Sequence, residues 1–282
     1  MRPRALTAAT LASIALVGAL SGCGRSAVVV GPLAQAADVT GHVGGAHMTL
    51  AARIEDAGLP QAVTMNGGGY FNFASHEGSF SIQLSGLPTE LAGSQPTMQE
   101  LFKGSNLYIG SSLLTGKLPG GARWMKVDLA RVGQAAGLDP SQLLSGQTNP
   151  VQILEYLKAS GAAVTAVGHE RIRGVSTTHY RAEIDLAKAV AALPGANAGE
   201  AQKAIGALGM SRLPMEVWVD SHNLVRRMQL DLHAPAGGQN LQMQMDVELF
   251  GFGATPTVSA PPASETFDAT SAALGGLGSS SL

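Results

Sequence analysis

The sequence predicts an α+β protein whose main element is one large, curved antiparallel β-sheet. Three observations favour this class. Most of the chain from residue 47 onward alternates apolar and polar residues, which is the period of a strand that buries one face. Two interruptions, over residues 129–160 and 187–209, carry helical signals instead. Strands with one apolar and one polar face are typical of antiparallel sheets solvated on one side, and inserted helices can cover the apolar face.

Residues 1–22 are predicted to be a lipoprotein signal peptide. Arg2 and Arg4 precede an uncharged apolar run over residues 5–20, which is short for a membrane span of ~20 apolar residues. The run ends at Leu20-Ser21-Gly22-Cys23, which resembles a bacterial lipobox. We therefore expect Cys23 to be acylated and to anchor the mature chain to the outer face of the cell membrane, since two or more acyl chains hold a protein stably. The alternative is an ordinary signal peptide that contains a cysteine.

Composition and turn signals predict the structure of the segments that follow residue 22. Residues 23–44 are small and glycine-rich, and we expect a tether or an irregular entry to the fold. A hairpin is predicted at Asn66-Gly67, because both residues tolerate positive φ. The strands expected in this half of the chain cover residues 47–55, 79–86, 106–110 and 123–129.

The second half begins with helical signals and returns to strands. Residues 151–161 carry an apolar stripe at helical spacing, with Gly161 as a C-terminal cap. Alanine-rich residues 187–209 predict one or two short helices. Strands are expected over residues 178–186, 213–220, 226–232 and 241–249. Residues 45–268 are therefore predicted to form a single domain, followed by a disordered tail over residues 269–282.

Composition and motifs exclude several classes of function. Charged residues make up 13% of the chain and the formal net charge is −2, so we expect no nucleic-acid binding. One cysteine excludes a disulfide framework and a cysteine-rich metal site. His42 and His47 have no carboxylates nearby in sequence, and residues 110–118 only resemble a phosphate-binding loop, with Leu118 where Ser or Thr should be. We expect no enzyme, no catalytic residues, no metal and no cofactor.

Three motifs in the C-terminal half carry a family resemblance. They are Gly168-His169-Glu170, the run Gly174–Tyr180, and Pro214 leading into Val217-Trp218-Val219-Asp220. Together with the lipobox they resemble the LppX/LprG-like (LppX_LprAFG) family of actinobacterial envelope lipoproteins, most clearly over residues 97–268. The resemblance implies a half-barrel sheet, LolA/LppX-like, wrapped over helices around a hydrophobic cavity. It also implies binding or movement of lipids and glycolipids of the cell envelope, with no catalytic residues to carry over.

An apolar sheet face can open around a ligand or close into a dry core, and the alternation alone explains both. Frequent methionine on the inward face favours a cavity, because the flexible thioether adapts to irregular partners. The residues that we expect to line it are Leu107, Ile109, Val127, Ile184, Val217, Val219, Met228, Leu230, Met243 and Met245.

Three functions therefore stay open. The first is a membrane-anchored lipoprotein that binds or shuttles lipid. The second is a closed-core interaction or sensor module that exposes Trp124 and Trp218 to an unknown protein partner. The third is an envelope hydrolase, for which no site is visible in the sequence.

Overall fold

The computed structural model describes residues 27–28, 31–56, 60–87, 96–136, 164–191, 205–206, 209–236 and 239–279. The predicted signal peptide, the lipobox with Cys23 and the helix predicted over residues 151–161 lie outside these ranges. All statements about the structure below concern the described residues.

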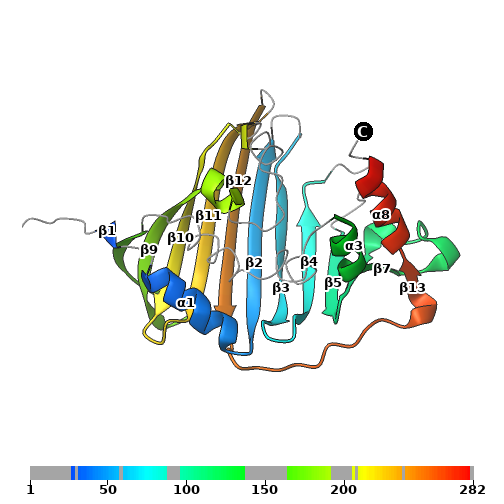
Figure 1. Cartoon of the computed structure of the whole chain (residues 1–282), viewed down its shortest axis with the longest axis horizontal. Helices are drawn as coiled ribbons and strands as arrows, with labels where there is room; N and C mark the ends of the chain where they lie inside the picture. The colour runs from blue at the N-terminus through cyan, green and yellow to red at the C-terminus, as the bar shows by residue number, and fades with distance from the viewer. Residues whose placement is uncertain are drawn as a thin grey trace, which may run out of the picture.

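The described strands form one 13-stranded sheet, which confirms the predicted α+β class (Figure 1). Its order is β1-β8-β9-β10-β11-β12-β2-β3-β4-β5-β6-β7-β13, and every pair is antiparallel except β13 with β7. The strands are β1 (Ala27–Val28), β2 (Gly45–Asp56), β3 (Val63–Asn72), β4 (Glu77–Ser85), β5 (Thr97–Lys103), β6 (Asn106–Ser111), β7 (Trp124–Asp128), β8 (Val164–Ile172), β9 (Val175–Asp185), β10 (Arg212–Asp220), β11 (Val225–Ala236), β12 (Gln239–Phe250) and β13 (Thr266–Asp268).

Short helices lie against the apolar face of this sheet. Helix α1 packs on β10 and β11, whereas α3 packs on β6, β7 and α8 (Figure 1). The described helices are α1 (Gly31–His42), α3 (Leu129–Ala136), α6 (Leu186–Ala191) and α8 (Thr270–Ser279), with 3-10 turns η1 (Ser112–Leu114), η2 (Pro119–Gly121) and η3 (Ala263–Glu265). The inward face of the sheet is therefore covered from two sides, near β10–β11 and near β6–β7.

Helix α1 corrects the tether that was predicted up to residue 44. Leu33, Ala36 and Ala37 are almost completely buried, at the i, i+3, i+4 spacing of one helical face. Thr40 is also buried, and its hydroxyl oxygen accepts a hydrogen bond from the Val225 backbone N–H at 3.0 Å. The prediction failed because the buried stripe consists mainly of small residues, which the composition did not separate from a linker.

Helix α8 corrects the disordered tail over most of its length. The Asp268 carboxylate accepts a hydrogen bond from the Thr270 N–H at 3.0 Å, which satisfies a free donor at the start of the helix. The Thr270 hydroxyl oxygen in turn accepts from the Asp128 N–H at the end of β7, at 3.0 Å. These two bonds tie a glycine- and serine-rich segment to the edge of the sheet.

The hairpin predicted at Asn66-Gly67 is also wrong, because β3 continues through it. Neither Gly67 nor Gly69 has a positive φ. A Cβ at Gly67 would lie 2.3 Å from the Ser81 carbonyl oxygen, and one at Gly69 would lie 2.0 Å from the Ser79 carbonyl oxygen. These glycines therefore allow β3 to approach β4 closely instead of turning the chain.

An aromatic cluster of the core packs at one end of the sheet, here called the base, where β2 begins and β12 ends. Phe71 packs edge-to-face against Phe73 and Phe102 there. The segment after β12 runs along the base towards β13 (Figure 1). It is held by a hydrogen bond of 2.6 Å from the Tyr70 hydroxyl to the Ala254 carbonyl oxygen. The opposite end, where β2 ends and β12 begins, is called the rim.

Candidate functional site

Across β2–β6 and β12, the inward face of the sheet becomes less buried from base to rim. Near the base, Met48, Phe102 and Leu249 are between 1% and 6% exposed. Towards the rim, apolar residues of the same face are only half-buried. We call these residues the rim surface: Ile54, Met65, Leu84, Met98, Leu230, Leu232, Met243 and Met245. Towards the rim end of β9–β11, by contrast, Ile184, Met215 and Ala234 are buried.

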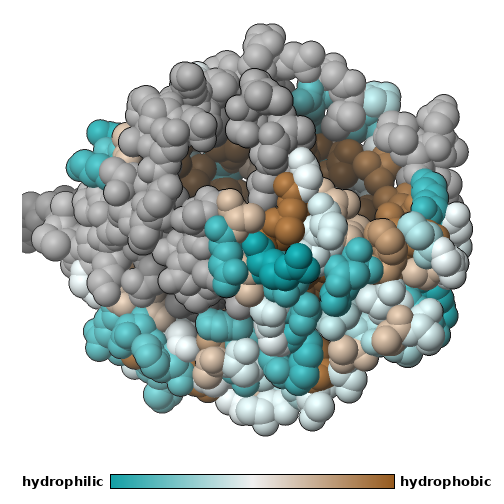
Figure 2. Space-filling view, turned by 45° about the vertical axis from the view of Figure 1, so that its right-hand side comes forward, coloured by the Kyte–Doolittle hydropathy of each residue, from teal (hydrophilic) through white to brown (hydrophobic). Residues whose placement is uncertain are grey.

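Strand pairing makes the rim surface continuous. Met243 lies opposite Ile54, and Met245 lies opposite both Ala52 and Leu230. Further along, Met65 lies opposite Leu84. Cross-strand partners share one face and sit within contact distance. Figure 2 shows a hollow in the upper part of the molecule that is lined by hydrophobic residues.

All ten predicted cavity residues lie on the inward face of the sheet, but their side chains are buried to different extents. Leu107, Ile184, Val217, Val219 and Met228 are buried in the core. Ile109, Val127, Leu230 and Met245 are partly buried and pack against that core, and Met243 is half-buried on the rim surface.

Sequence reasoning missed several rim residues that obey the same alternation. Ile54, Met65, Leu84 and Met98 lie in strands of the first half of the chain, where the family resemblance is weak or only begins. It also missed Glu100, an acidic residue in an inward-facing position of β5. The alternation of β5, with Met98 and Phe102 on either side of Glu100, was the signal that could have found it.

The outward face of the sheet carries charged clusters rather than an exposed aromatic patch. Trp218 is only 3% exposed, because it stacks on His179 with ring centroids 4.2 Å apart and the Arg227 guanidinium covers its ring at 4.8 Å. Its indole N–H donates to Glu170 at 3.1 Å. The prediction that Trp218 is exposed as an anchor for a protein partner is therefore wrong.

Glu216 lies beside this cluster, and its carboxylate is bonded by two side chains of β9. It accepts hydrogen bonds from Arg181, at 2.9 Å, and from His179. Burial alone would raise the pKa of Glu216, but these bonds outweigh burial and hold the pKa below its ordinary value. The contacts of His179 with Glu216 and Trp218 therefore give its side chain a structural role on the outward face of the sheet.

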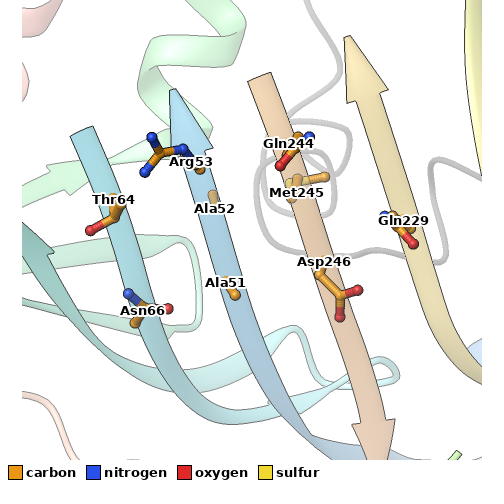
Figure 3. Close-up of a pocket in the computed structure, with 9 residues that line it drawn as sticks. All are labelled: Ala51, Ala52, Arg53, Thr64, Asn66, Gln229, Gln244, Met245 and Asp246. Carbon is orange, nitrogen blue, oxygen red and sulfur yellow. The ribbon is translucent and has the colours of Figure 1, made fainter. Parts of the chain in front are cut away.

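Two pockets open on the outward face. One, of about 240 Å³, spans β2, β3, β11 and β12 and is lined largely by polar side chains such as Arg53, Asn66 and Gln244 (Figure 3). The other, of about 430 Å³, lies beside β5–β7 next to Trp124, whose ring lies 3.0 Å from where a Cβ on Gly110 would be. Met245 is the residue of the rim surface that also lines the first pocket.

His42 and His47, the two histidines considered as metal ligands, make different contacts in the structure. His42 is at the exposed end of α1, where its ring nitrogen bonds the Asp38 carbonyl oxygen at 2.7 Å. His47 stacks on Phe250 in the sheet, with ring centroids 5.7 Å apart. None of the helices in the described ranges is long and apolar enough to cross a membrane.

Comparison with known proteins gives one curated relative and several similar folds. No family model matches the chain. An uncharacterized 31.2 kDa protein from the rplA-rplJ intergenic region of Streptomyces griseus is 28% identical over 140 residues, which is 48% of this chain and 45% of that protein. The chain therefore spans less than half the length of the curated relative that it matches.

Among solved structures, LprF from Mycobacterium bovis has a TM-score of 0.45 at 17% identity, covering 83% of this chain and 97% of its own. The lipoprotein LppX of Mycobacterium tuberculosis has the same TM-score and identity, covering 82% of this chain and 97% of its own. A LolA superfamily protein of Nitrosomonas europaea has a TM-score of 0.28 at 11% identity, covering 82% and 96%.

Proposed function

We propose that this protein is an envelope lipoprotein that binds the acyl chains of a lipid on its rim surface and shuttles that lipid along the outer face of the membrane. The observation that carries the proposal is the burial gradient of the inward face across β2–β6 and β12. A dry core would bury the rim residues as completely as the base residues, but Met243, Met245 and Leu230 stay half-buried.

The chemistry of the rim surface suits acyl chains. Four of its eight members are methionines, whose flexible thioethers adapt to chains of different shape. Each methylene moved out of water contributes about 0.8 kcal/mol, so ten methylenes contribute on the order of 8 kcal/mol. Part of this is offset by the loss of freedom of the bound chain. Binding of this kind needs no catalytic group.

The predicted anchor supports the same function. An acylated Cys23 would hold the domain at a membrane, from which an acyl chain can leave for the rim surface. The support is the charged, then apolar, then small-residue order of residues 1–23. The interaction-module alternative has lost one of its two tryptophan anchors, because Trp218 is buried by His179 and Arg227, whereas Trp124 is half-buried.

A plug variant tests the proposal. Met245→Trp adds bulk on the rim surface and should weaken binding of a fluorescent fatty-acyl probe about tenfold or more, since overfilled apolar sites typically lose 1–3 kcal/mol. Gln244→Trp is the matched control, because the adjacent side chain of the same strand faces outward and should leave binding unchanged. Both are made in the full chain that carries Cys23→Ser.

The parent protein should also carry acyl lipids through purification, which mass spectrometry of an organic extract would detect. An extract without lipid, together with no saturable binding of the probe, would rule out the proposed function. Equal binding by Met245→Trp and Gln244→Trp would place the lipid somewhere other than the rim surface.

A further inference from the structure

Glu100 is an acidic side chain on the apolar, inward face of the sheet. Its direct cross-strand neighbours are Phe80 in β4 and Ile109 in β6. Along its own strand, the residues on the same face are Met98, which belongs to the rim surface, and Phe102, which is 1% exposed in the core. Glu100 therefore lies where the packed base meets the rim surface.

The carboxyl group of Glu100 lacks a partner within the part of the chain that the structure describes. Other acidic residues in this half of the sheet have one. Glu77 of β4 pairs with Lys103 at 2.8 Å, and Asp268 of β13 pairs with Lys126 at 2.7 Å. Burial raises the pKa of Glu100, since no donor or cation compensates for its lost hydration.

An unpartnered carboxyl group in this position costs stability, and an apolar residue would continue the pattern of β5. Sequences break such local rules most often at functional sites, where the cost is offset by binding. The free carboxyl oxygens are hydrogen-bond acceptors, and Glu100 lies on the same inward face as the rim surface. A bound group that donates a hydrogen bond would satisfy them, whereas an anionic group would be repelled in an environment of low dielectric constant.

We propose that Glu100 is the specificity-determining contact of the lipid site, which accepts a hydrogen bond from a hydroxyl group of an uncharged acyl lipid and disfavours lipids with an anionic end. The inference rests on the proposed lipid-binding function and deepens it. The methionines and leucines of the rim surface bind the chain without selecting its head, and Glu100 selects the head. The ligand class is thus an uncharged, hydroxyl-bearing acyl lipid, not a free fatty acid.

The experiment compares three probes at one pH, 7.5, on the full chain carrying Cys23→Ser. The probes are monoolein, oleate and the hydrocarbon diphenylhexatriene. We expect the parent protein to bind monoolein at least about tenfold more tightly than oleate, the size of effect that one hydrogen bond to a charged group provides. Glu100→Gln keeps an acceptor without the charge, so it should bind oleate more tightly and retain monoolein.

Glu100→Leu removes both the acceptor and the charge. It should weaken the binding of monoolein about tenfold, strengthen the binding of oleate and leave the binding of diphenylhexatriene unchanged. Gln99→Leu is the matched control, because Gln99 faces outward on the same strand and its change should affect none of the three probes. The melting temperature of Glu100→Leu should rise, whereas a residue with a purely structural role would lower it.

The outcomes separate the two proposals. If the parent protein binds diphenylhexatriene but the ratio of monoolein to oleate affinity is the same in Glu100→Leu, the role of Glu100 is overturned and the lipid site stands. If none of the three probes binds the parent protein, the proposed function itself fails.

Discussion

Asp220 shows how a single carboxylate organises a turn in this protein. It lies at the end of β10, and its side chain is 1% exposed. It accepts hydrogen bonds from the backbone N–H groups of His222 and Leu224, at 2.8 and 3.0 Å, and pairs with Arg226 at 2.7 Å. Burial would raise the pKa of Asp220, but the Leu224, Arg226 and His222 bonds together lower it.

Replacing Asp220 should destabilise the protein strongly. We expect Asp220→Ala to cost about 3 kcal/mol of unfolding free energy, because it leaves Arg226 unpaired and two backbone donors unsatisfied. Glu183→Gln, which removes an exposed pair with Arg212, is the control and should cost less than about 1 kcal/mol. Denaturant unfolding measures both, and equal costs would contradict this account.

The lowered pKa also fixes the sign of the pH dependence. The folded state binds its proton at lower pH than the unfolded state, so the stabilisation by Asp220 is present above the unfolded pKa, near 4, and is lost as the pH falls through the folded pKa. The difference in unfolding free energy between the parent and Asp220→Ala should therefore shrink below about pH 4.

At the scale of elements, the glycine run of β3 decides how two strands meet. Gly67 and Gly69 point inward and lie against the β4 backbone, while Gly68 lies against β2, with its Cβ position 2.8 Å from the Met48 carbonyl oxygen. Any side chain here would push neighbouring strands apart. Sheet curvature at this point therefore depends on the absence of a Cβ.

We expect Gly69→Ala to destabilise the protein by about 2 kcal/mol or more, since its Cβ would lie 2.0 Å from the Ser79 carbonyl oxygen. Gly168→Ala in β8 is the matched control. That glycine also lies in a strand without a positive φ, but nothing lies within 4 Å of its Cβ position. Thermal unfolding compares the two, and a similar melting temperature for both variants would refute the close-approach explanation.

At the scale of the whole molecule, the sheet is closed at its base and apolar at its rim. Helix α1 on β10–β11 and helix α3 on β6–β7 pack against the same inward face, and the segment after β12 crosses the base between them (Figure 1). The rim surface lies at the other end. Lipid exchange at a membrane would need that rim close to the bilayer, which an anchor on the same molecule favours.

The anchor is tested with the full chain in cells that process lipoproteins. Wild-type protein should sediment with membranes and stay there after a carbonate wash, whereas Cys23→Ser should be released, because only an acylated cysteine provides buried hydrocarbon chains. Ser21→Ala is the control, since a small residue before the cysteine is kept. Retention of Cys23→Ser on washed membranes would show that another segment holds the protein there.

The sequence by itself determined which residues share a face, because the period of two is local and survives in any pairing of the strands. It thus predicted the sheet class, the inward side of Met243 and Met245, and the Cys23 motif. How deeply those side chains are buried was decided only by the tertiary structure. Burial depends on which end of each strand a distant helix covers, and α1, built from small residues, gave no periodic signal. The same long-range packing buried Trp218 under His179 and Arg227 and left Glu100 without a described partner.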